Sequence, residues 1–355
     1  IDRPRLAARE LDRAEIEALA AAAIPPALGA DIVAAWDFSR DIPSETIRDA
    51  SPNRLDGYTV NLPTRAVTGH NWDGSDTSWT RAPHQYGAIH FHDDDLSDAR
   101  WPAAFSFEVP ASLRSGCYAV LLEAAEAEFQ IPFFVRPAHR ARRAPVVYLA
   151  ATATYTVYCN NAGRFRTAMT EVMQGRLTVI DAIDMLLLRH PELGLSTYDR
   201  HTDGSGVATS SRLRPATNTR PTGRFWNYCA DLFIVDWLER SGIAFDVVTD
   251  EDLHREGLDA IRGNRVLVTG SHPEYASREV LDALEAFLRR GGRMMYLGGN
   301  GFYWRIAHHP AQPGIIEVRR AEDGTRAWDA EPGEYYHAFT GEYGGLWRRN
   351  GRPPQ

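Results

Sequence analysis

Cysteine is scarce in this sequence: 355 residues contain only Cys117, Cys159 and Cys229. Three scattered cysteines exclude a disulfide framework and a zinc site built on cysteine, and they fit a reducing cytoplasm best. An apolar run of about 18 residues, the length that spans a bilayer, is also lacking, so we expect no membrane span. The first residues mix charges with alanine and lack the apolar core of a secretory signal.

Positive charge is in deficit as well. The sequence has 39 basic and 47 acidic residues, which gives a formal net charge of −8. A protein that binds a phosphate backbone normally carries a basic surface, because neutralising phosphates is the main source of its affinity. We therefore expect no nucleic-acid partner.

The composition is otherwise that of a folded globular protein, with 44% hydrophobic and 24% charged residues. This length predicts at least two domains. We expect a helical segment over residues 1–31, with a helix from Leu11 to Ala23, a β-rich domain over 32–137 and an α/β domain over 138–355. Because there is no initiator Met and no closing element after residue 341, we expect a piece of a longer protein, with the last domain incomplete.

The β-rich domain is predicted from short apolar or alternating runs separated by Asp, Asn, Gly and Pro. Many short strands with turn signals between them favour a β-sandwich, a fold that more often binds or braces than catalyses. The predicted strands are IVAAWDF, GYTVNL, YGAIHFH, FSFEV, CYAVLLEA and FQIPFFV.

After a basic linker at 136–145, apolar strand candidates alternate with helix candidates. This order is typical of a parallel sheet with helices on its faces, and such folds bind ligands outside the carboxyl ends of their strands. The predicted elements are PVVYLAATAT (strand), FRTAMTEVMQGRLTVIDAIDMLLLRH (one or two helices), ADLFIVDWLERSG (helix), AFDVVTDEDL (strand and turn), NRVLVTGS (strand), SREVLDALEAFLRRGG (helix) and RMMYLGGNG (strand and loop).

His272 and Glu274 lie two residues apart in TGSHPEYAS, directly after the predicted strand VLV. An imidazole and a carboxylate at one strand tip can serve as base and metal ligand. A turn explains the same residues without chemistry: Glu274 then caps the helix that starts at Ser277, and His272 makes a hydrogen bond. Both interpretations stay open at this point.

Tyrosines follow another strand, where TYTVYCNN places Tyr155 and Tyr158 beside two asparagines. Most tyrosines are core or rim aromatics whose hydroxyl group is satisfied. Phenolate is nevertheless a hard anionic oxygen donor that suits ferric iron. Tyr198 lies in the polar loop GLSTYDRHTDGSG, where a large aromatic has no periodic role in a core.

A second candidate metal site lies in the β-rich domain. His90 and His92 are two residues apart and precede Asp93, Asp94 and Asp95. On a strand this spacing places both imidazoles on one face, as some metal sites require. Hydrogen bonding to the next domain is the alternative, because an Asp run is commonly a solvated turn.

The glycine-rich segment GGNGFYW, at 298–304, follows the last predicted strand. It has neither the Lys-Ser/Thr of a P-loop nor the GxGxxG of a dinucleotide site. We interpret its glycines as allowing close approach of the backbone to a ligand, with Asn300 as an amide donor to an oxyanion. The sequence has no GxSxG elbow, and no cysteine lies in a catalytic motif, which disfavours serine and cysteine hydrolases.

Several segments in order, over about Ile32 to Trp347, resemble the large (beta) subunit of the N,N-dimethylformamidase family. They are AAWDFSRDIPSETIRDASPNRLDG, NLPTRAVTGHNWDG, YGAIHFHDDDLSDA, LSTYDRHTDGSGVATSSRLRPATNTRP, DLFIVDWLERSGIAFDVVTDEDLH, TGSHPEYAS and YLGGNGFYWRI. The resemblance implies a glutamine amidotransferase-like α/β domain preceded by lectin-like β material, an amide hydrolase acting on small N-substituted formamides, and possible partners in a small subunit and further copies of this chain.

The resemblance also implies a mononuclear ferric ion held by two tyrosines and one glutamate. These ligands correspond to Glu274, Tyr198 and a tyrosine of TYTVYCNN, for which we prefer Tyr158 over Tyr155. His272 corresponds to the family's catalytic histidine and Asn300 to its asparagine. We expect His272 to take a proton from water and deliver it to the departing amine, and Asn300 to stabilise the oxyanion.

Two other functions fit the sequence. One is a non-catalytic module that recognises a polymer or a partner subunit. The other is a divalent-metal hydrolase centred on His90, His92 and Asp94.

Overall fold

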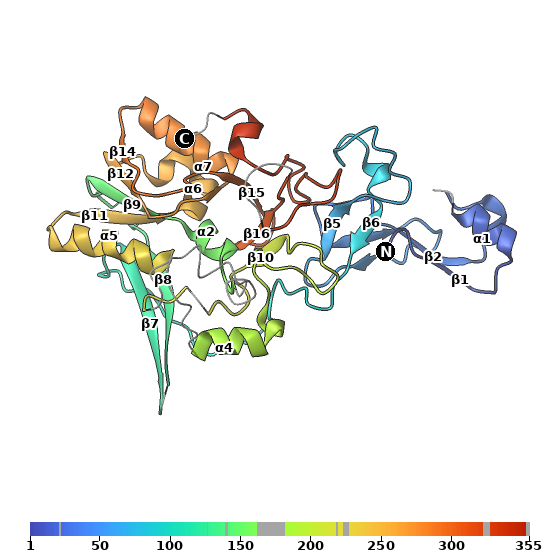
Figure 1. Ribbon diagram of the computed structural model, residues 1–355, viewed down its shortest axis with the longest axis horizontal. Coiled ribbons are helices and arrows are strands. Elements are labelled where there is room, and N and C mark those ends of the chain that lie inside the picture. Colours follow the sequence, from blue (N-terminus) through green and yellow to red (C-terminus); the bar gives the residue numbers. More distant parts are fainter. Residues whose placement is uncertain are drawn as a thin grey trace.

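A parallel sheet forms the centre of the α/β part, as predicted (Figure 1). The computed structural model describes residues 1–20, 23–125, 127–138, 141–161, 182–217, 219–222, 227–321 and 327–352. The sheet has the order β11-β9-β12-β14, and every neighbouring pair is parallel. Its strands are β9 (Val146–Ala150), β11 (Phe245–Thr249), β12 (Val266–Thr269) and β14 (Arg293–Met295).

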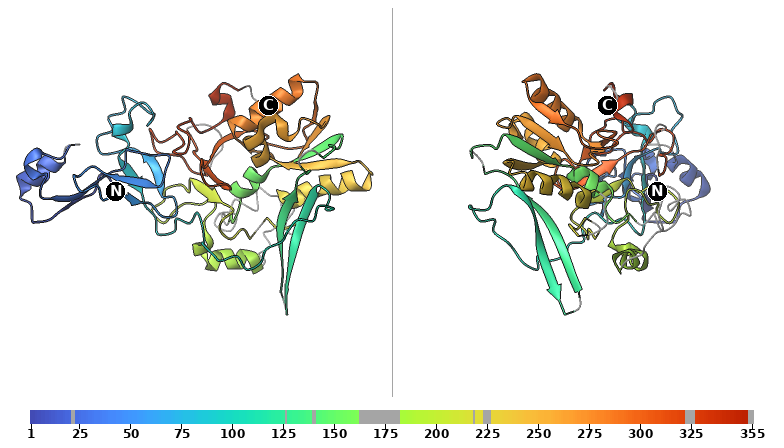
Figure 2. Two further views of the ribbon diagram at one scale, coloured as in Figure 1. Left: turned by 180° about the vertical axis from the view of Figure 1, so that it is seen from behind. Right: turned by 60° about the vertical axis from the view of Figure 1, so that its left-hand side comes forward.

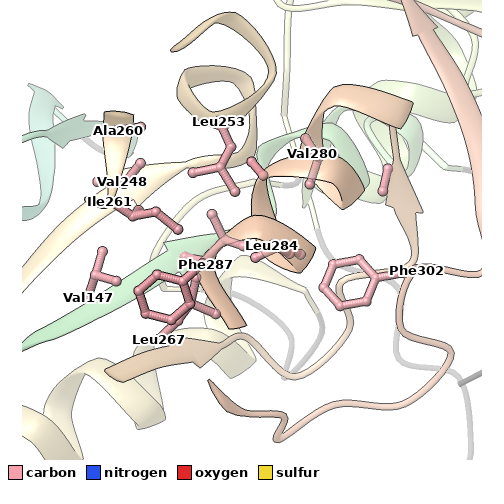
Figure 3. Packing of buried hydrophobic residues seen from close by; sticks show 13 residues of the cluster. Val147, Val248, Leu253, Ala260, Ile261, Leu267, Val280, Leu284, Phe287 and Phe302 are labelled. Carbon is pink, nitrogen blue, oxygen red and sulfur yellow. The ribbon is translucent and has the colours of Figure 1, made fainter. Parts of the chain in front are cut away.

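Helices cover both faces of this sheet, because successive side chains of a strand point to opposite faces. On one face, Val147 and Leu149 of β9 join an apolar cluster with α6 (Asp250–Glu256) and α7 (Arg278–Arg289). Figure 3 shows the Phe287 ring of α7 against the strands. Every third or fourth residue of α7 is buried, so its apolar stripe matches the predicted helical period.

The opposite face is covered by α5 (Tyr228–Arg240) and by a hairpin of β7 (Gly116–Ala124) and β8 (Ala127–Val135). Tyr148 of β9 packs there in a cluster that includes Cys117 of β7. The hairpin projects away from the sheet in Figures 1 and 2. Its apolar base is thus part of the core of the α/β part.

The connections of the sheet define one point at which the chain changes direction. The chain runs from β9 to β11 on one side and from β12 to β14 on the other, so β9 and β12 are neighbours whose connections leave in opposite directions. In open parallel sheets, the crevice outside the carboxyl ends of such a strand pair is where ligands bind. The segments after β9 and β12 are therefore the first place to look for a site.

A second, mixed sheet lies beside this point and has the order β10-β16-β15-β13. Trp304, Ile306, Ile316 and Val318 of this sheet pack against Val157 in an apolar cluster. The strands are β10 (Thr209–Ser211), β13 (Tyr275–Ala276), β15 (Trp304–His308) and β16 (Ile315–Val318).

The β-rich part contains one four-stranded antiparallel sheet and one antiparallel pair. These do not test the predicted sandwich, which stays a prediction, as does the amidotransferase-like class. The elements are β1 (Arg5–Ala7), β2 (Ile32–Asp37), β3 (Thr46–Asp49), β4 (Gly57–Tyr58), β5 (Thr64–Val67) and β6 (Ala88–His90). Short 3-10 turns are η1 (Pro26–Leu28), η2 (Pro83–Gln85), η4 (Pro191–Leu193), η5 (Gly257–Ala260) and η6 (Trp347–Asn350).

Two local predictions differ from the structure. The first helix, α1 (Arg13–Leu19), is shorter than predicted; it begins after Asp12, whose side chain accepts from the Glu15 N–H. Residues 21 and 22 lie outside the described part. The predicted strand FSFEV, 105–109, is wrong: this segment forms no ladder, and Phe105 and Phe107 are about half exposed. Of the segment predicted to hold one or two helices, 165–190, residues 165–181 lie outside the described residues, and its last part forms α4 (Ala182–Arg189).

No helix in the described ranges combines the length and the apolar character needed to cross a bilayer.

The central strands make a stability prediction. Leu267 of β12 is fully buried between β9 and β14, so we expect Leu267→Ala to lower the free energy of unfolding by about 2–5 kcal/mol. Leu288, at the end of α7, is 45% exposed, and Leu288→Ala should cost less than about 1 kcal/mol. Urea denaturation of both variants measures the difference; equal losses would contradict the assigned core.

Candidate active site

Two segments meet at the carboxyl ends of β9 and β12. The first is α2 (Thr152–Val157), which follows β9 and has Tyr158 at its C-terminal cap. The second is the loop after β12 that carries His272 and Glu274, as predicted. The strand-end crevice thus brings together residues that are more than 100 positions apart in the sequence.

The predicted strand PVVYLAATAT is shorter than expected, because β9 ends at Ala150 and a helix follows. The carboxylate of Asp250, at the end of β11, accepts hydrogen bonds from the Ala153 backbone and from the Thr152 hydroxyl group. Burial raises the pKa of Asp250 to about 7, although these bonds oppose the shift. The helix start depends on this distant partner, which overrides the low helix propensity of threonine.

Four of the predicted side chains form a continuous chain of short contacts. The Tyr198 hydroxyl donates to the Tyr158 oxygen over 2.6 Å, and the Tyr158 hydroxyl donates to Glu274 Oε2 over 2.7 Å. His272 Nε2 lies 2.8 Å from the same Oε2. Glu274 is 3% exposed, so its carboxylate is held by these partners rather than by water.

Backbone contacts fix the positions of both tyrosines. Ser196 Oγ and Thr197 Oγ1 donate to the Val157 carbonyl over 3.1 and 3.2 Å, which ties the loop before Tyr198 to the residue before Tyr158. The two phenol rings stack with centroids 4.3 Å apart and planes at 18°. The stacking and the backbone contacts together hold both hydroxyl groups side by side.

Thr154 of α2 positions the carboxylate loop. Its Oγ1 accepts hydrogen bonds from the backbone N–H groups of Glu274 and Tyr275, at 3.1 and 3.2 Å. Thr154 is fully buried, so no water competes for these bonds. The relative placement of Tyr158 and Glu274 is therefore set by main-chain contacts and not by their side chains alone.

Tyr275 and Arg320 extend the chain on the side away from Glu274. The Tyr275 and Tyr198 hydroxyl oxygens are 2.7 Å apart, and Arg320 Nη2 donates to the Tyr275 oxygen over 3.0 Å. The Arg320 guanidinium also lies 4.7 Å from the centre of the Tyr198 ring. The Tyr198 hydroxyl is the donor in its hydrogen bond to Tyr158, so the Tyr275 hydroxyl must be the donor in its hydrogen bond to Tyr198. Every hydrogen bond of this chain is therefore donated in the direction from the Arg320 guanidinium toward the Glu274 carboxylate.

Burial keeps these phenols protonated in the absence of a cation. Desolvation raises the pKa of Tyr158, and the neighbouring phenols and Glu274 add to the shift. Desolvation and Glu274 also raise the pKa of Tyr198, whereas Arg320 lowers it. A cation that binds the two phenols must therefore displace protons from them.

Tyr155, the alternative to Tyr158, belongs to a different polar cluster. Its hydroxyl donates to Asp231 of α5, which also accepts from Tyr148 and from the Ser271 backbone and side chain. Asp231 is 1% exposed and thereby anchors the start of the loop that carries His272. Tyr155 points to the face of the sheet covered by α5 and does not join Tyr158 and Glu274.

Asn300 lies on the loop after β14, which packs against the loop after β12. The Gly299 N–H donates to the Ser271 carbonyl over 3.0 Å, and a Cβ atom on Gly298 would lie 2.7 Å from the Pro273 ring. Asn300 itself is exposed and has a φ of 50°. Within the described ranges, no hydrogen bond links its amide to Tyr158, Tyr198, His272 or Glu274.

The alternative interpretation of Glu274 as a helix cap is wrong. Ser277 caps α7, and its Oγ accepts from the Val280 N–H over 3.4 Å. The carboxylate of Glu274 points to Tyr158 and His272 instead.

The prediction for His90 and His92 also changes. β6 ends at His90, so the two residues do not share a strand face, and their rings meet edge to face with centroids 6.3 Å apart. Burial lowers the pKa of His90. The structure places His201, which the sequence did not single out, beside His92.

Three buried residues of the site were missed from the sequence: Tyr275, Arg320 and Asp231. Tyr275 follows Glu274 directly, so the same motif contains a signal for it. Arg320 lies in a pair of arginines after an apolar strand, and Asp231 lies in a helix. Nothing in the local sequence distinguishes either from a solvated surface charge.

The fold and these contacts define a class: an α/β protein whose buried phenol, imidazole and carboxylate groups meet at the switch point of a parallel sheet. Residues 64–355 match the family described as N,N-dimethylformamidase beta subunit-like, C-terminal. The chain therefore belongs to this family, and the resemblance seen in the sequence is confirmed.

Two curated relatives are both named N,N-dimethylformamidase beta subunit. The protein from Alcaligenes sp is 41% identical over 91% of this chain and 44% of its own length. The protein from Paracoccus aminophilus is 39% identical over 100% of this chain and 48% of its own length. The chain thus spans about half the length of the curated relatives it matches.

Asp231 makes a testable prediction for the support of the site. Asp231→Ala would leave the hydroxyl groups of Tyr148 and Tyr155 and both donors of Ser271 without their partner, and we expect it to lower the free energy of unfolding by roughly 3 kcal/mol or more. Asp236, on the same helix, has a 54% exposed side chain paired with Arg240, so Asp236→Ala should cost less than about 1 kcal/mol. Urea denaturation compares them; a small loss for Asp231→Ala would show that the cluster does not brace the loop.

Proposed function

We propose that this chain carries the catalytic centre of an iron-dependent amide hydrolase that converts small N-substituted formamides to formate and an amine. The observation that carries the proposal is the convergence of the Tyr158, Tyr198 and Glu274 oxygens, with His272 on the same carboxylate. The relatives' name supplies the reaction class. The proposed ligands of the ferric ion are Tyr158, Tyr198 and Glu274.

The donor set fits a hard trivalent cation. Phenolate and carboxylate oxygens are hard donors, and no soft sulfur ligand is among them. The Tyr158 oxygen lies 2.6 Å from the Tyr198 oxygen and 2.7 Å from Glu274 Oε2. Adjacent ligand atoms about 2.0–2.1 Å from one octahedral ion are roughly 2.8–3.0 Å apart, which is close to the spacing of these two oxygen pairs.

When bound, a ferric ion would supply Lewis-acid polarisation of the substrate carbonyl and a lowered pKa of water. His272 is the proposed acceptor of the proton of the attacking water, because Glu274 Oε2, 2.8 Å from its Nε2, orients the imidazole beside the cluster. After the tetrahedral intermediate forms, the same imidazole delivers that proton to the leaving amine. Asn300, on the neighbouring loop, would turn its amide toward the oxyanion when substrate binds.

Assembly is also part of the proposal. The curated relatives are named beta subunits, a name that implies another subunit. We infer that this chain works in a protein with a small subunit and further copies of itself. A small amide is the substrate, and neither nucleic acid nor a membrane is a partner.

The ligand assignment makes a prediction about metal content. We expect the wild-type protein to bind one ferric ion per chain with a visible charge-transfer absorption, and Tyr158→Phe, Tyr198→Phe and Glu274→Gln to lose both. Tyr155→Phe is the matched control, because Tyr155 is a nearby buried tyrosine that bonds Asp231 instead. Elemental analysis and a visible spectrum measure the outcome. Full iron in Tyr198→Phe would refute the assignment, and a metal-free wild type would favour the non-catalytic module.

The role of His272 makes a separate prediction about turnover. His272→Ala removes the proton acceptor but none of the proposed ligands, so amine release from N,N-dimethylformamide should fall by about 10²–10⁴-fold while iron content stays unchanged. His84→Ala, an exposed histidine in the β-rich part, is the control. Turnover at the wild-type rate in His272→Ala would exclude His272 as the acid–base residue.

A further inference from the structure

A second group of ligand-type side chains lies apart from the tyrosine cluster. His92 and Asp95 follow β6, and His201 lies in the loop that begins with Tyr198. The His92 and His201 rings are parallel, with centroids 3.6 Å apart and planes at 2°. Each of the two side chains is 3% exposed. The group therefore connects the β-rich part to the loop that carries Tyr198, a proposed iron ligand.

The inner atoms of this group face one another. Asp95 Oδ1 is 3.3 Å from His92 Nδ1 and 3.9 Å from His201 Nε2. One ligand atom from each of the three residues lies within 4.8 Å of the others. Ligand atoms of a tetrahedral zinc ion, about 2.0–2.1 Å from the metal, are roughly 3.3 Å apart. The pair of Asp95 and His92 already has this spacing, and binding one cation would require the His201 imidazole to move toward Asp95.

The outer ring nitrogens already have partners of the kind that orient metal ligands. His201 Nδ1 contacts the Asp94 carboxylate, and His92 Nε2 lies 2.9 Å from Ser205 Oγ. A carboxylate on the outer nitrogen fixes the tautomer and leaves the lone pair of the inner nitrogen free. His201 Nε2 therefore faces Asp95 across 3.9 Å, too far for a hydrogen bond, so no proton bridges these two electron-rich atoms.

The local charge is strongly negative. Asp93, Asp94, Asp95 and Asp203 surround the two imidazoles, and the sequence contains no lysine. Within the part of the chain that is described, no arginine forms an ion pair with any of these four carboxylates. A positive charge is what this environment lacks.

A hollow of about 280 Å³ adjoins the outer side of the group. Asp203 and Ser205, which both contact His92 Nε2, line this hollow together with His90 and Trp328.

We propose that His92, Asp95 and His201 form a second, structural site for a divalent cation of the zinc class. Two imidazoles and one carboxylate are a ligand set that zinc accepts, with water in the fourth position. The bound cation would fasten the segment after β6 to residues 201–205 and so hold the loop of Tyr198. This site and the proposed iron centre share no ligand.

The test uses the whole chain stripped of metal with a chelator and titrated with Co²⁺, a coloured substitute for Zn²⁺. We expect one tight equivalent in the wild type, and a loss of affinity of more than about 100-fold in His201→Asn and in Asp95→Asn. In His201→Asn the amide can still donate to Asp94, so the hydrogen bond is kept while the inner ligand is lost. Glu274→Gln and His84→Ala should retain the tight equivalent. Retention in Glu274→Gln separates this site from the iron centre.

Thermal unfolding supplies a second measurement. Saturating Zn²⁺ should raise the Tm of the wild type and of His84→Ala, because a ligand that binds only the folded state stabilises it, and should leave the Tm of His201→Asn unchanged. Equal Co²⁺ affinity and an equal Zn²⁺ shift in wild type and in His201→Asn would overturn the proposal. So would a wild type that binds no Co²⁺, since the group would then be a hydrogen-bonded network only.

Discussion

The buried carboxylate of Glu274 is the constraint on which the candidate site depends. An uncompensated carboxylate in a protein interior is strongly unfavourable, so its surroundings must supply donors or a cation. Tyr158 and His272 supply donors directly, and Tyr198, Tyr275 and Arg320 continue the chain of hydrogen bonds to a buried positive charge. Each bond polarises the next, so the cluster is most stable when all its members are present.

The fold meets this constraint through main-chain contacts. Thr154 binds the backbone of the Glu274 loop, the Val157 carbonyl binds the Tyr198 loop, and Asp231 binds the start of the loop after β12. All three contacts surround the carboxyl ends of β9 and β12, where the connections of the sheet diverge. These contacts fix the positions of the side chains of the candidate site, and such preorganisation is what the proposed hydrolysis of an amide would require.

The loop of Tyr198 connects the two parts of the molecule. On one side it carries a phenol of the candidate active site, and a few residues later it carries His201, which packs on His92 of the β-rich part. The β-rich part thus contacts the loop that carries a tyrosine of the candidate site.

The sequence by itself determined the parallel sheet, the helices α5 and α7, and the position of His272 and Glu274 after a strand. These features can be read from short segments, because they depend on the spacing of apolar residues and on the polar residues that directly follow a strand. It left open whether Tyr155 or Tyr158 joins the site, and it missed Arg320, Asp231 and His201. Those depend on the tertiary structure: Asp250 supports a helix after β9, which directs Tyr155 to the face of the parallel sheet covered by α5 and Tyr158 to the cluster of the mixed sheet. A partner a hundred residues away leaves no trace in a local pattern, so only the folded chain decides which polar side chains meet.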